Sequence, residues 1–231
     1  MQPSGQHDKQ DVASSLRQQI LSLQISPGQM LDEAELAQAF GISRTPLREV
    51  IQRLGGEGYL VFRKNRGAKV APMDLTTLRQ FFQAAPMIYA AVARLAAENA
   101  TASGIRSLKE IQKTYRAAIA AGDGNSSALE NHRFHAEIGV MAASAYLLPS
   151  LNRLLIDHTR IGQIFYRSNN SRDSDRIRKA ADQHDELIAA IGSHSPAEAV
   201  EITLRHWALS RDQMERFVQP DPLPFEIAGG F

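Results

Sequence analysis

The chain has 231 residues, which is enough for one large domain or two smaller ones. Hydrophobic residues make up 43% of the sequence and charged residues 22%, so the chain can bury a core and is not mainly disordered. It contains no cysteine, which excludes disulfides, thiolate metal ligands and cysteine nucleophiles. No apolar run approaches the roughly 20 residues that span a bilayer, and the first residues lack the pattern of a signal peptide. We therefore expect a cytoplasmic protein with no membrane partner.

The net charge of +1 conceals an uneven distribution of charge along the chain. Residues 41–72 carry seven Lys or Arg residues and two Glu residues, a net charge of +5. Residues 73–231 carry 17 basic and 18 acidic residues and are therefore nearly neutral. A cationic segment beside a neutral one suggests a module that binds a polyanion. The alternative is a solvated basic surface without a partner.

The first 70 residues predict three helices and a hairpin. The apolar spacing predicts helices over 11–23, 32–40 and 43–54, and strands over 59–62 and 68–70. Asp32 and Ser43 are suitable N-caps for the second and third helices, which are expected to end at Gly41 and before Gly55-Gly56. Helix, helix, short turn, helix and hairpin is the order of a winged helix-turn-helix.

In such a unit the third helix enters the major groove of DNA with its first turns toward the base edges. Arginine can form two hydrogen bonds with one guanine, and hydroxyl groups suit phosphate oxygens. The basic tip of the hairpin can contact the DNA backbone or the minor groove. The candidate DNA-binding residues are Ser43, Arg44, Thr45, Arg48, Lys64, Arg66 and Gly67. A solvent-facing helix with ordinary arginines is the alternative.

After Asp74, a suitable N-cap, the sequence contains no strand pattern. Amphipathic helices are predicted over 75–100, 105–121, 127–142, 147–168, 174–191 and 196–218. Short connections between such helices imply an antiparallel bundle. The expected domains are a DNA-binding domain over 9–72, a helical domain over 74–219 and a tail over 220–231. The fold class is mainly α.

Three histidines of the helical half, His135, His184 and His206, stand on apolar stripes of separate helices. Asn131 lies four residues before His135, so both side chains project from one helix face. If the stripes meet inside the bundle, the imidazoles form a site for a transition metal such as zinc or nickel. The sequence does not place the stripes together, and histidines that serve only as core residues are the alternative. His132, His158 and His194 are interpreted as ordinary structural residues, and Trp207 as a packing residue.

The segment from Leu36 to Val50, LAQAFGISRTPLREV, followed by Arg53-Leu54 and Glu57-Gly58-Tyr59-Leu60, closely resembles the N-terminal domain of GntR-family bacterial transcription regulators. The resemblance covers about residues 9–71. It implies that Arg44, Thr45, Arg48 and Gly67 touch operator DNA. Members often have an arginine in the second helix where this chain has Ala34.

Residues 75–218 resemble the FCD ligand-binding domain of the FadR branch of that family. Its signature is an acid, two residues and Phe-His, followed by two later histidines on separate helices. Here these positions hold Asn131, Phe134-His135, His184 and His206. The resemblance implies that the three histidines hold a metal ion, which in turn helps to bind a small organic acid. Asn131 replaces the family's aspartate with a neutral oxygen ligand, which should weaken the site.

The family often has an arginine and a glutamate in its first bundle helix, where this chain places Ala85 and Tyr89. Other polar side chains would then have to contact the effector. The candidate effector contacts are Tyr89, Arg160, Gln163 and Tyr166. Arg160 is equally compatible with a surface position.

The leading hypothesis is a ligand-responsive transcription regulator, not an enzyme. One basic helix reads only a half-site, so a homodimer on double-stranded operator DNA is expected. The family resemblance implies a repressor that a small metabolite releases. Two alternatives remain open. One is a metal-dependent, hydrolase-like enzyme, and the other is an architectural DNA-binding protein without an effector.

Overall fold

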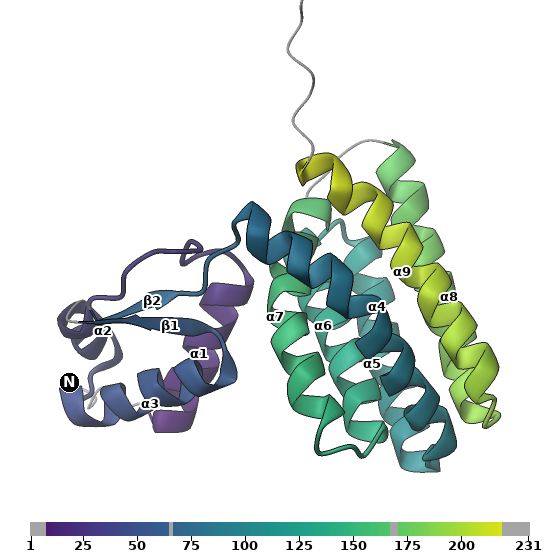
Figure 1. Ribbon diagram of the computed structural model, residues 1–231, viewed down its shortest axis with the longest axis horizontal. Helices are drawn as coiled ribbons and strands as arrows, with labels where there is room; N and C mark the ends of the chain where they lie inside the picture. The colour runs from purple at the N-terminus through teal and green to yellow at the C-terminus, as the bar shows by residue number, and fades with distance from the viewer. Residues whose placement is uncertain (1–7, 65–66, 167–170, 219–231) are drawn as a thin grey trace, which may run out of the picture.

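The structure, a computed structural model, describes residues 8–64, 67–166 and 171–218 (Figure 1). Within these residues a unit of three helices and a hairpin precedes a bundle of long helices. The predicted fold class is confirmed. The elements in chain order are α1 (Lys9–Leu21), α2 (Glu33–Phe40), α3 (Arg44–Glu57), β1 (Leu60–Arg63), β2 (Gly67–Val70), α4 (Leu75–Glu98), α5 (Ala102–Ala120), α6 (Gly124–Met141), α7 (Leu147–Tyr166), α8 (Ser171–Gly192) and α9 (Pro196–Val218).

The N-terminal unit has a hydrophobic core of its own. The apolar faces of α1 and α3 meet there and bury side chains that include Val12, Leu16, Ile20, Leu47, Val50, Ile51 and Leu54. Leu23, expected on the first helix, lies beyond it, because α1 ends at Leu21 and Leu23 has a positive φ of 61°. The helical spacing of the earlier apolar residues is confirmed.

The second and third helices begin where the sequence predicts. The Asp32 carboxylate accepts hydrogen bonds from the backbone N–H groups of Ala34 and Glu35, at 2.7 and 3.1 Å. Ser43 occupies the N-cap position of α3 with an extended backbone, but its hydroxyl makes no capping hydrogen bond. Its exposed side chain is therefore free to bind another partner.

The prediction that the third helix ends before Gly55-Gly56 is wrong. The helix α3 continues to Glu57, and Gly58 ends it with a left-handed φ of 92°. Gly55 serves packing instead, because a Cβ atom there would lie 2.3 Å from Cε2 of Phe62. The absent side chain lets the hairpin lie against the helix. The two strands pair in antiparallel register, Leu60 opposite Val70.

The helical half is a bundle of antiparallel helices with a second core. Asp74 is the N-cap of helix α4, and its carboxylate accepts a 2.8 Å hydrogen bond from the N–H of Thr77. Helix α4 packs against α9, α6 and α7. Helices α5 and α8 also pack against each other. In the part of the chain that the structure describes, no helix combines the length and apolar character that a membrane crossing requires. The expected tail, residues 220–231, lies outside the described residues.

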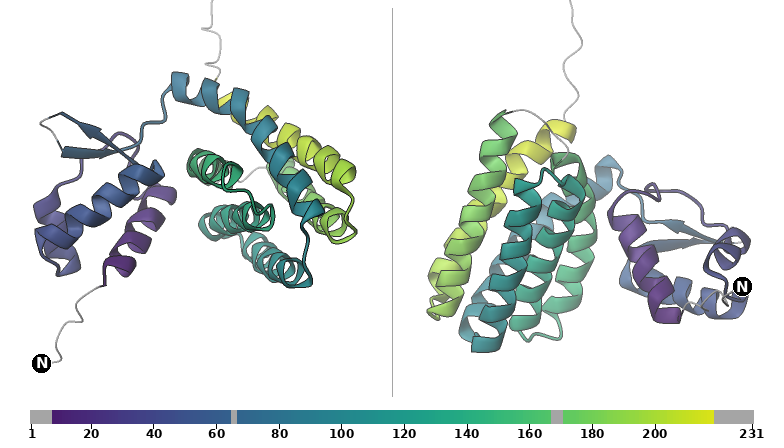
Figure 2. Two further views of the ribbon diagram at one scale, coloured as in Figure 1. Left: turned by 60° about the horizontal axis from the view of Figure 1, so that its bottom comes forward. Right: turned by 180° about the vertical axis from the view of Figure 1, so that it is seen from behind.

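Helix α7 is the helix of the bundle that faces the N-terminal unit (Figure 2). Ile156 of α7 is fully buried and belongs to the N-terminal core, although it lies on a bundle helix. Nearby, Arg160 donates a 2.6 Å hydrogen bond from Nη1 to the carbonyl of Ala71, at the end of the hairpin. A second nitrogen of the guanidinium, Nη2, donates to Asp157, which also accepts a bond from Arg153. The two units therefore share side chains across the junction.

Candidate functional site: a DNA-binding face and a histidine cluster

The first turns of α3 present polar side chains to solvent. Arg44, Thr45 and Arg48 are exposed, while Leu47 and Val50 on the opposite side of α3 are buried in the core. Packing of the apolar side thus orients the polar side outward. This arrangement leaves both arginines able to reach an external acceptor such as a base edge.

Arg48 has a partner within the unit. Its Nε lies 2.7 Å from a carboxylate oxygen of Glu33, the first residue of α2. The Arg48 side chain is 65% exposed, so this ion pair contributes little stability, on the order of 0–1 kcal/mol. The pair holds the guanidinium in one direction while leaving it accessible. The sequence reasoning did not identify Glu33.

The hairpin tip carries the second part of the face. Lys64 is exposed, and Gly67 begins β2 with a left-handed φ of 76° and open space around its Cα. This positive φ favours glycine, and the absent side chain permits close approach of another molecule. Arg66, the other predicted wing contact, lies outside the described residues.

The three predicted histidines converge inside the bundle. His135 of α6, His184 of α8 and His206 of α9 are all buried, and each offers a ring nitrogen within 4.8 Å of the other two. Their stripes therefore meet, which the sequence could not establish. Nitrogen donors around a tetrahedral zinc ion lie roughly 3.4 Å apart. The ring nitrogens, up to 4.8 Å apart, would have to move closer together to hold zinc at that spacing.

The ring nitrogens of this cluster are suited to a cation. Nε2 of His135 and Nε2 of His184 are buried and have no hydrogen-bond partner. Burial lowers the pKa of both rings well below the usual value, and the neighbouring histidines lower it further. Burial also lowers the pKa of His206 to about 4. Neutral imidazoles with unused lone pairs are the form in which histidine binds a metal, so the residues present fit such an ion.

A small cavity adjoins the cluster. It measures about 20 Å³ and is lined by Asn131, His158, Gly162, Phe165, Tyr166, Ala180 and His206. Asn131, predicted as an oxygen ligand, thus faces the same space as His206. A cavity of this size holds about one water molecule. It leaves room for a water ligand, but not for an organic acid.

The structure adds one residue, His158, to this region. His158 of α7, interpreted from the sequence as an ordinary histidine, has its ring centroid 5.5 Å from that of His135 and lines the cavity. Its Nδ1 shares a 2.6 Å hydrogen bond with the hydroxyl of Tyr89. Trp207 stacks on Tyr89, in agreement with its predicted packing role. The apolar stripe around His158 resembles that of any core helix, so the sequence carried no signal for it.

The four predicted effector contacts have different positions. Tyr89 packs edge-on against the ring of His135, with centroids 5.3 Å apart, and its hydroxyl bonds to His158. The Tyr166 hydroxyl lies 2.7 Å from that of Tyr115. Gln163 is buried and donates to Asn125, and its Oε1 has no partner. Arg160 bonds to Asp157 and the carbonyl of Ala71 at the junction. This geometry does not support an effector contact of Arg160 inside the bundle. The alternative prediction, a surface position for Arg160, is also wrong, because the residue is fully buried.

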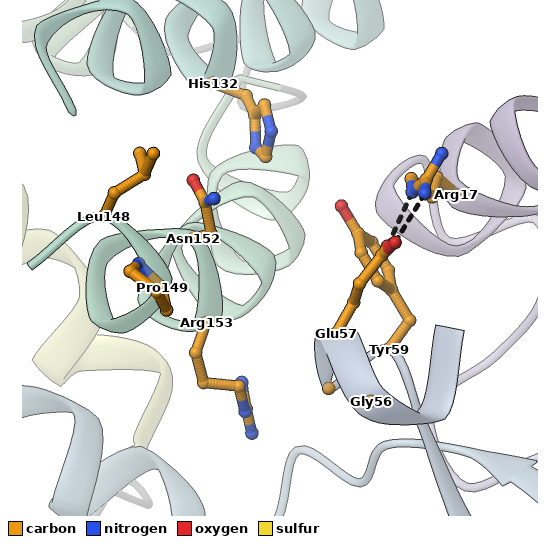
Figure 3. Close-up of a pocket in the computed structure, with 10 residues that line it drawn as sticks. Arg17, Gly56, Glu57, Tyr59, His132, Leu148, Pro149, Asn152 and Arg153 are labelled. Atoms are coloured by element: carbon orange, nitrogen blue, oxygen red, sulfur yellow. Dashed lines mark hydrogen bonds and ion pairs between the residues drawn. The ribbon is translucent and has the colours of Figure 1, made fainter. Parts of the chain in front are cut away.

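A larger cavity of about 650 Å³ lies between the two halves (Figure 3). The bundle side contributes His132, Asn152 and Arg153, and the N-terminal side contributes Tyr59 and the Arg17–Glu57 ion pair. This cavity is separate from the three buried histidines. The three histidines therefore adjoin the small cavity inside the bundle, not this one.

Two family models match the chain, one for each half. Residues 8–70 match the model described as bacterial regulatory proteins, gntR family, and residues 80–209 match the FCD domain. The second match alone spans more than half of the chain. The chain belongs to the FCD-containing gntR family of bacterial regulatory proteins. Both resemblances drawn from the sequence are thereby confirmed at this level.

Several curated proteins are similar to this regulator. The Nta operon transcriptional regulator of Aminobacter aminovorans is 31% identical over 105 residues, which is 45% of this chain and 50% of that protein. The HTH-type transcriptional repressor RspR of Escherichia coli K12 is 33% identical over 110 residues, 48% of each chain. The matches to these two relatives therefore span only about half of their length.

Solved structures share the fold over most of the chain. E. coli McbR/YncC superposes with a TM-score of 0.72 at 21% identity, covering 89% of this chain and 97% of that one. Lar, which controls the expression of the Listeria monocytogenes agr system, gives a TM-score of 0.59 at 18% identity, covering 92% and 99%. At these identities the comparisons establish the architecture alone.

Proposed function

We propose that the protein is a cytoplasmic, homodimeric transcription repressor of the FadR branch, which binds operator DNA and responds to a metal-assisted effector. The observation that carries this proposal is the pairing of an exposed basic helix, α3, with a buried cluster of three histidines in one chain. The relatives of known role are transcription regulators, one of them a repressor. This favours regulation over the alternatives of a metalloenzyme or an architectural protein.

DNA binding rests on the residues at the start of α3 and on the wing. The guanidinium groups of Arg44 and Arg48 face solvent and can read base edges in the major groove. Ser43 and Thr45 offer hydroxyl groups to DNA phosphates. Lys64 supplies a positive charge that attracts the phosphates of any DNA sequence. Arg66 is proposed as a second charge of this kind. Because one such face covers only a half-site, two copies are needed to bind a palindrome.

His135, His184 and His206 are proposed to hold one divalent transition metal, zinc or nickel, with Asn131 as a weaker oxygen ligand. Such an ion would supply a Lewis-acidic centre to which a carboxylate can bind. The unpartnered Nε2 atoms of His135 and His184 support this assignment, because buried polar atoms are nearly always satisfied. His158 lines the cavity beside them and keeps its Nδ1 engaged with Tyr89.

The effector is proposed to be a small organic acid that reaches the cluster past Tyr166. Tyr166 borders both the 20 Å³ cavity and a cavity of about 440 Å³ at the end of the bundle. Displacement of its ring would join the two spaces. Gln163, with its unpartnered Oε1, would offer a further polar contact.

Helix α7 provides a physical connection from this site to the DNA-binding unit. It carries His158, which lines the histidine cavity, and Ile156, which packs in the N-terminal core. Arg160 of the same helix is bonded to the carbonyl of Ala71. A shift of α7 on effector binding would therefore move the DNA-binding unit and change the spacing of the two half-site readers in a dimer.

The test begins with selection of the preferred sequence from random duplex DNA, followed by anisotropy titrations at fixed salt. Arg44→Ala should weaken binding to the selected site about 10–100-fold, equivalent to about 1–3 kcal/mol, and relax its base preference. Lys113→Ala, which removes an exposed charge on α5 of the bundle, serves as the control and should leave affinity unchanged. Equal affinity of wild type and Arg44→Ala for all duplexes would contradict the proposal.

A further inference from the structure

Two buried glutamines contact the Nδ1 atoms of two rings in the histidine cluster. Gln112 of α5 and Gln183 of α8 are 3% and 2% exposed. Nδ1 of His184 lies 3.1 Å from Oε1 of Gln112, and Nδ1 of His206 lies 3.1 Å from Oε1 of Gln183. Both contacts are made through Nδ1, so neither involves Nε2. Each of these histidines thus has one nitrogen engaged with a glutamine.

The orientation of the Gln112 amide is fixed by a third group. Its Nε2 donates a 2.7 Å hydrogen bond to the backbone carbonyl of Ala181, which can only accept. The oxygen of the amide must therefore face His184. Because that oxygen is also only an acceptor, the proton of the contact belongs to Nδ1 of His184. In a neutral ring this leaves Nε2 of His184 with a free lone pair, at the atom that has no protein partner.

We propose that Gln112 and Gln183 are positioning residues, which fix His184 and His206 in the Nδ1–H tautomer so that both rings turn an unprotonated Nε2 toward the metal position. The proposal rests on the metal-binding function proposed above for the same cluster. It adds the groups that prepare the ligands before an ion arrives. Such partners of metal-binding histidines typically contribute 10–100-fold to metal affinity.

The arrangement also connects the helices that carry the ligands. Gln112 of α5 is bonded to both Ala181 and His184, which lie one turn apart on α8. Gln183 of α8 in turn is bonded to His206 on α9. Each glutamine therefore fixes a ring and holds two helices in register. A buried glutamine amide needs hydrogen-bond partners of some kind. That need alone does not explain why both amide oxygens contact Nδ1 of a histidine in the same cluster.

The experiment compares wild type with Gln112→Met, Gln183→Met and Gln183→Glu. The first two variants remove the acceptor at nearly constant volume, and the third keeps an acceptor oxygen. Circular dichroism establishes that each variant is folded. Histidine-selective ¹⁵N labelling and two-bond ¹H–¹⁵N spectra of the metal-free protein then identify the protonated nitrogen, with His184→Gln and His206→Gln used for assignment. A chelator competition measures the affinity for zinc.

We expect Nδ1–H signals for His184 and His206 in wild type. In the methionine variants we expect loss of that preference at the affected ring, together with zinc binding that is 10–100-fold weaker. Gln183→Glu should keep the tautomer of His206 and bind zinc at least as tightly as wild type at neutral pH. If either methionine variant fails to fold, the spectrum of wild type and the other substitution still decide the outcome.

Two results would overturn the inference. One is an Nε2–H signal for His184 or His206 in the metal-free wild type. The other is unchanged zinc affinity in both methionine variants. If wild type binds no zinc at all, the metal centre proposed above is wrong, whereas the tautomer signals still decide whether the glutamines position the rings.

Discussion

Lowering the pH of the metal-free protein should destabilise the bundle strongly between pH 7 and 5.5. His135, His158, His184 and His206 are at most 7% exposed. Burial lowers the pKa of His206 to about 4 and that of His158 to about 3, and it lowers the pKa of His135 and His184 well below the usual value. All four rings therefore stay neutral in the folded protein at pH 5.5.

The unfolded chain behaves differently, because its histidines titrate near 6.5. It binds more protons than the folded chain below that pH, so the free energy of unfolding falls as the pH falls through 6.5. The loss continues until the pH reaches the lowered pKa of each folded ring, about 4 for His206 and about 3 for His158. From pH 7 to 5.5 each of these histidines costs about 1.3 kcal/mol, so the four together cost about 5 kcal/mol. His132, whose pKa burial also lowers to about 4, adds a similar amount to the loss. That is a large share of the ~5–15 kcal/mol typical of a native protein.

Urea denaturation with a chelator present, at pH 7.0, 6.25 and 5.5, measures this loss. Fluorescence of Trp207, which stacks on Tyr89 beside the cluster, reports the bundle specifically. His158→Gln removes one of the five rings whose pKa burial lowers, His132 included, and should reduce the pH-dependent loss by about a fifth. A free energy of unfolding that changed by less than about 1 kcal/mol between pH 7.0 and 5.5 would refute the assignment of four neutral, buried rings.

Three further outcomes are expected. Glu33→Gln removes the partner of Arg48 and a negative charge beside the DNA-binding face, so it should tighten binding to all duplexes several-fold in anisotropy titrations; weaker binding would contradict this. Asn131→Asp should lower the dissociation constant for zinc in chelator competition, because a carboxylate binds a cation better than an amide. Light scattering should give about twice 25.5 kDa, and a monomer with full operator affinity would exclude the two-half-site arrangement.

Most of the fold follows from local signals in the sequence. Apolar spacing in α1 and the caps at Asp32 and Asp74 predict helix starts to within a few residues, because capping and amphipathicity are properties of short segments. The end of α3 was mispredicted because a glycine pair resembles a helix stop. Gly55 instead makes room for the ring of Phe62, a contact between elements.

The histidine site was predictable in part. The helical stripes of His135, His184 and His206 predicted which rings face the core, and the family resemblance predicted that they belong together. The roles of His158 and Gln112 depend on contacts between residues 69 and 72 positions apart in the chain, which periodicity does not encode. Arg160 shows the same limit, since its bond to Ala71 spans 89 positions.

The junction formed by Ile156 and Arg160 bears on how regulators of this architecture can diversify. Exchange of DNA-binding modules between bundles would bring a new operator under the control of an old effector. In this chain such an exchange would leave Ile156 without its N-terminal core and the buried Arg160 guanidinium without the carbonyl of Ala71. The guanidinium would keep Asp157, but a buried donor that loses its acceptor lowers stability. Viable chimeras should therefore inherit helix α7 together with the DNA-binding module that it contacts.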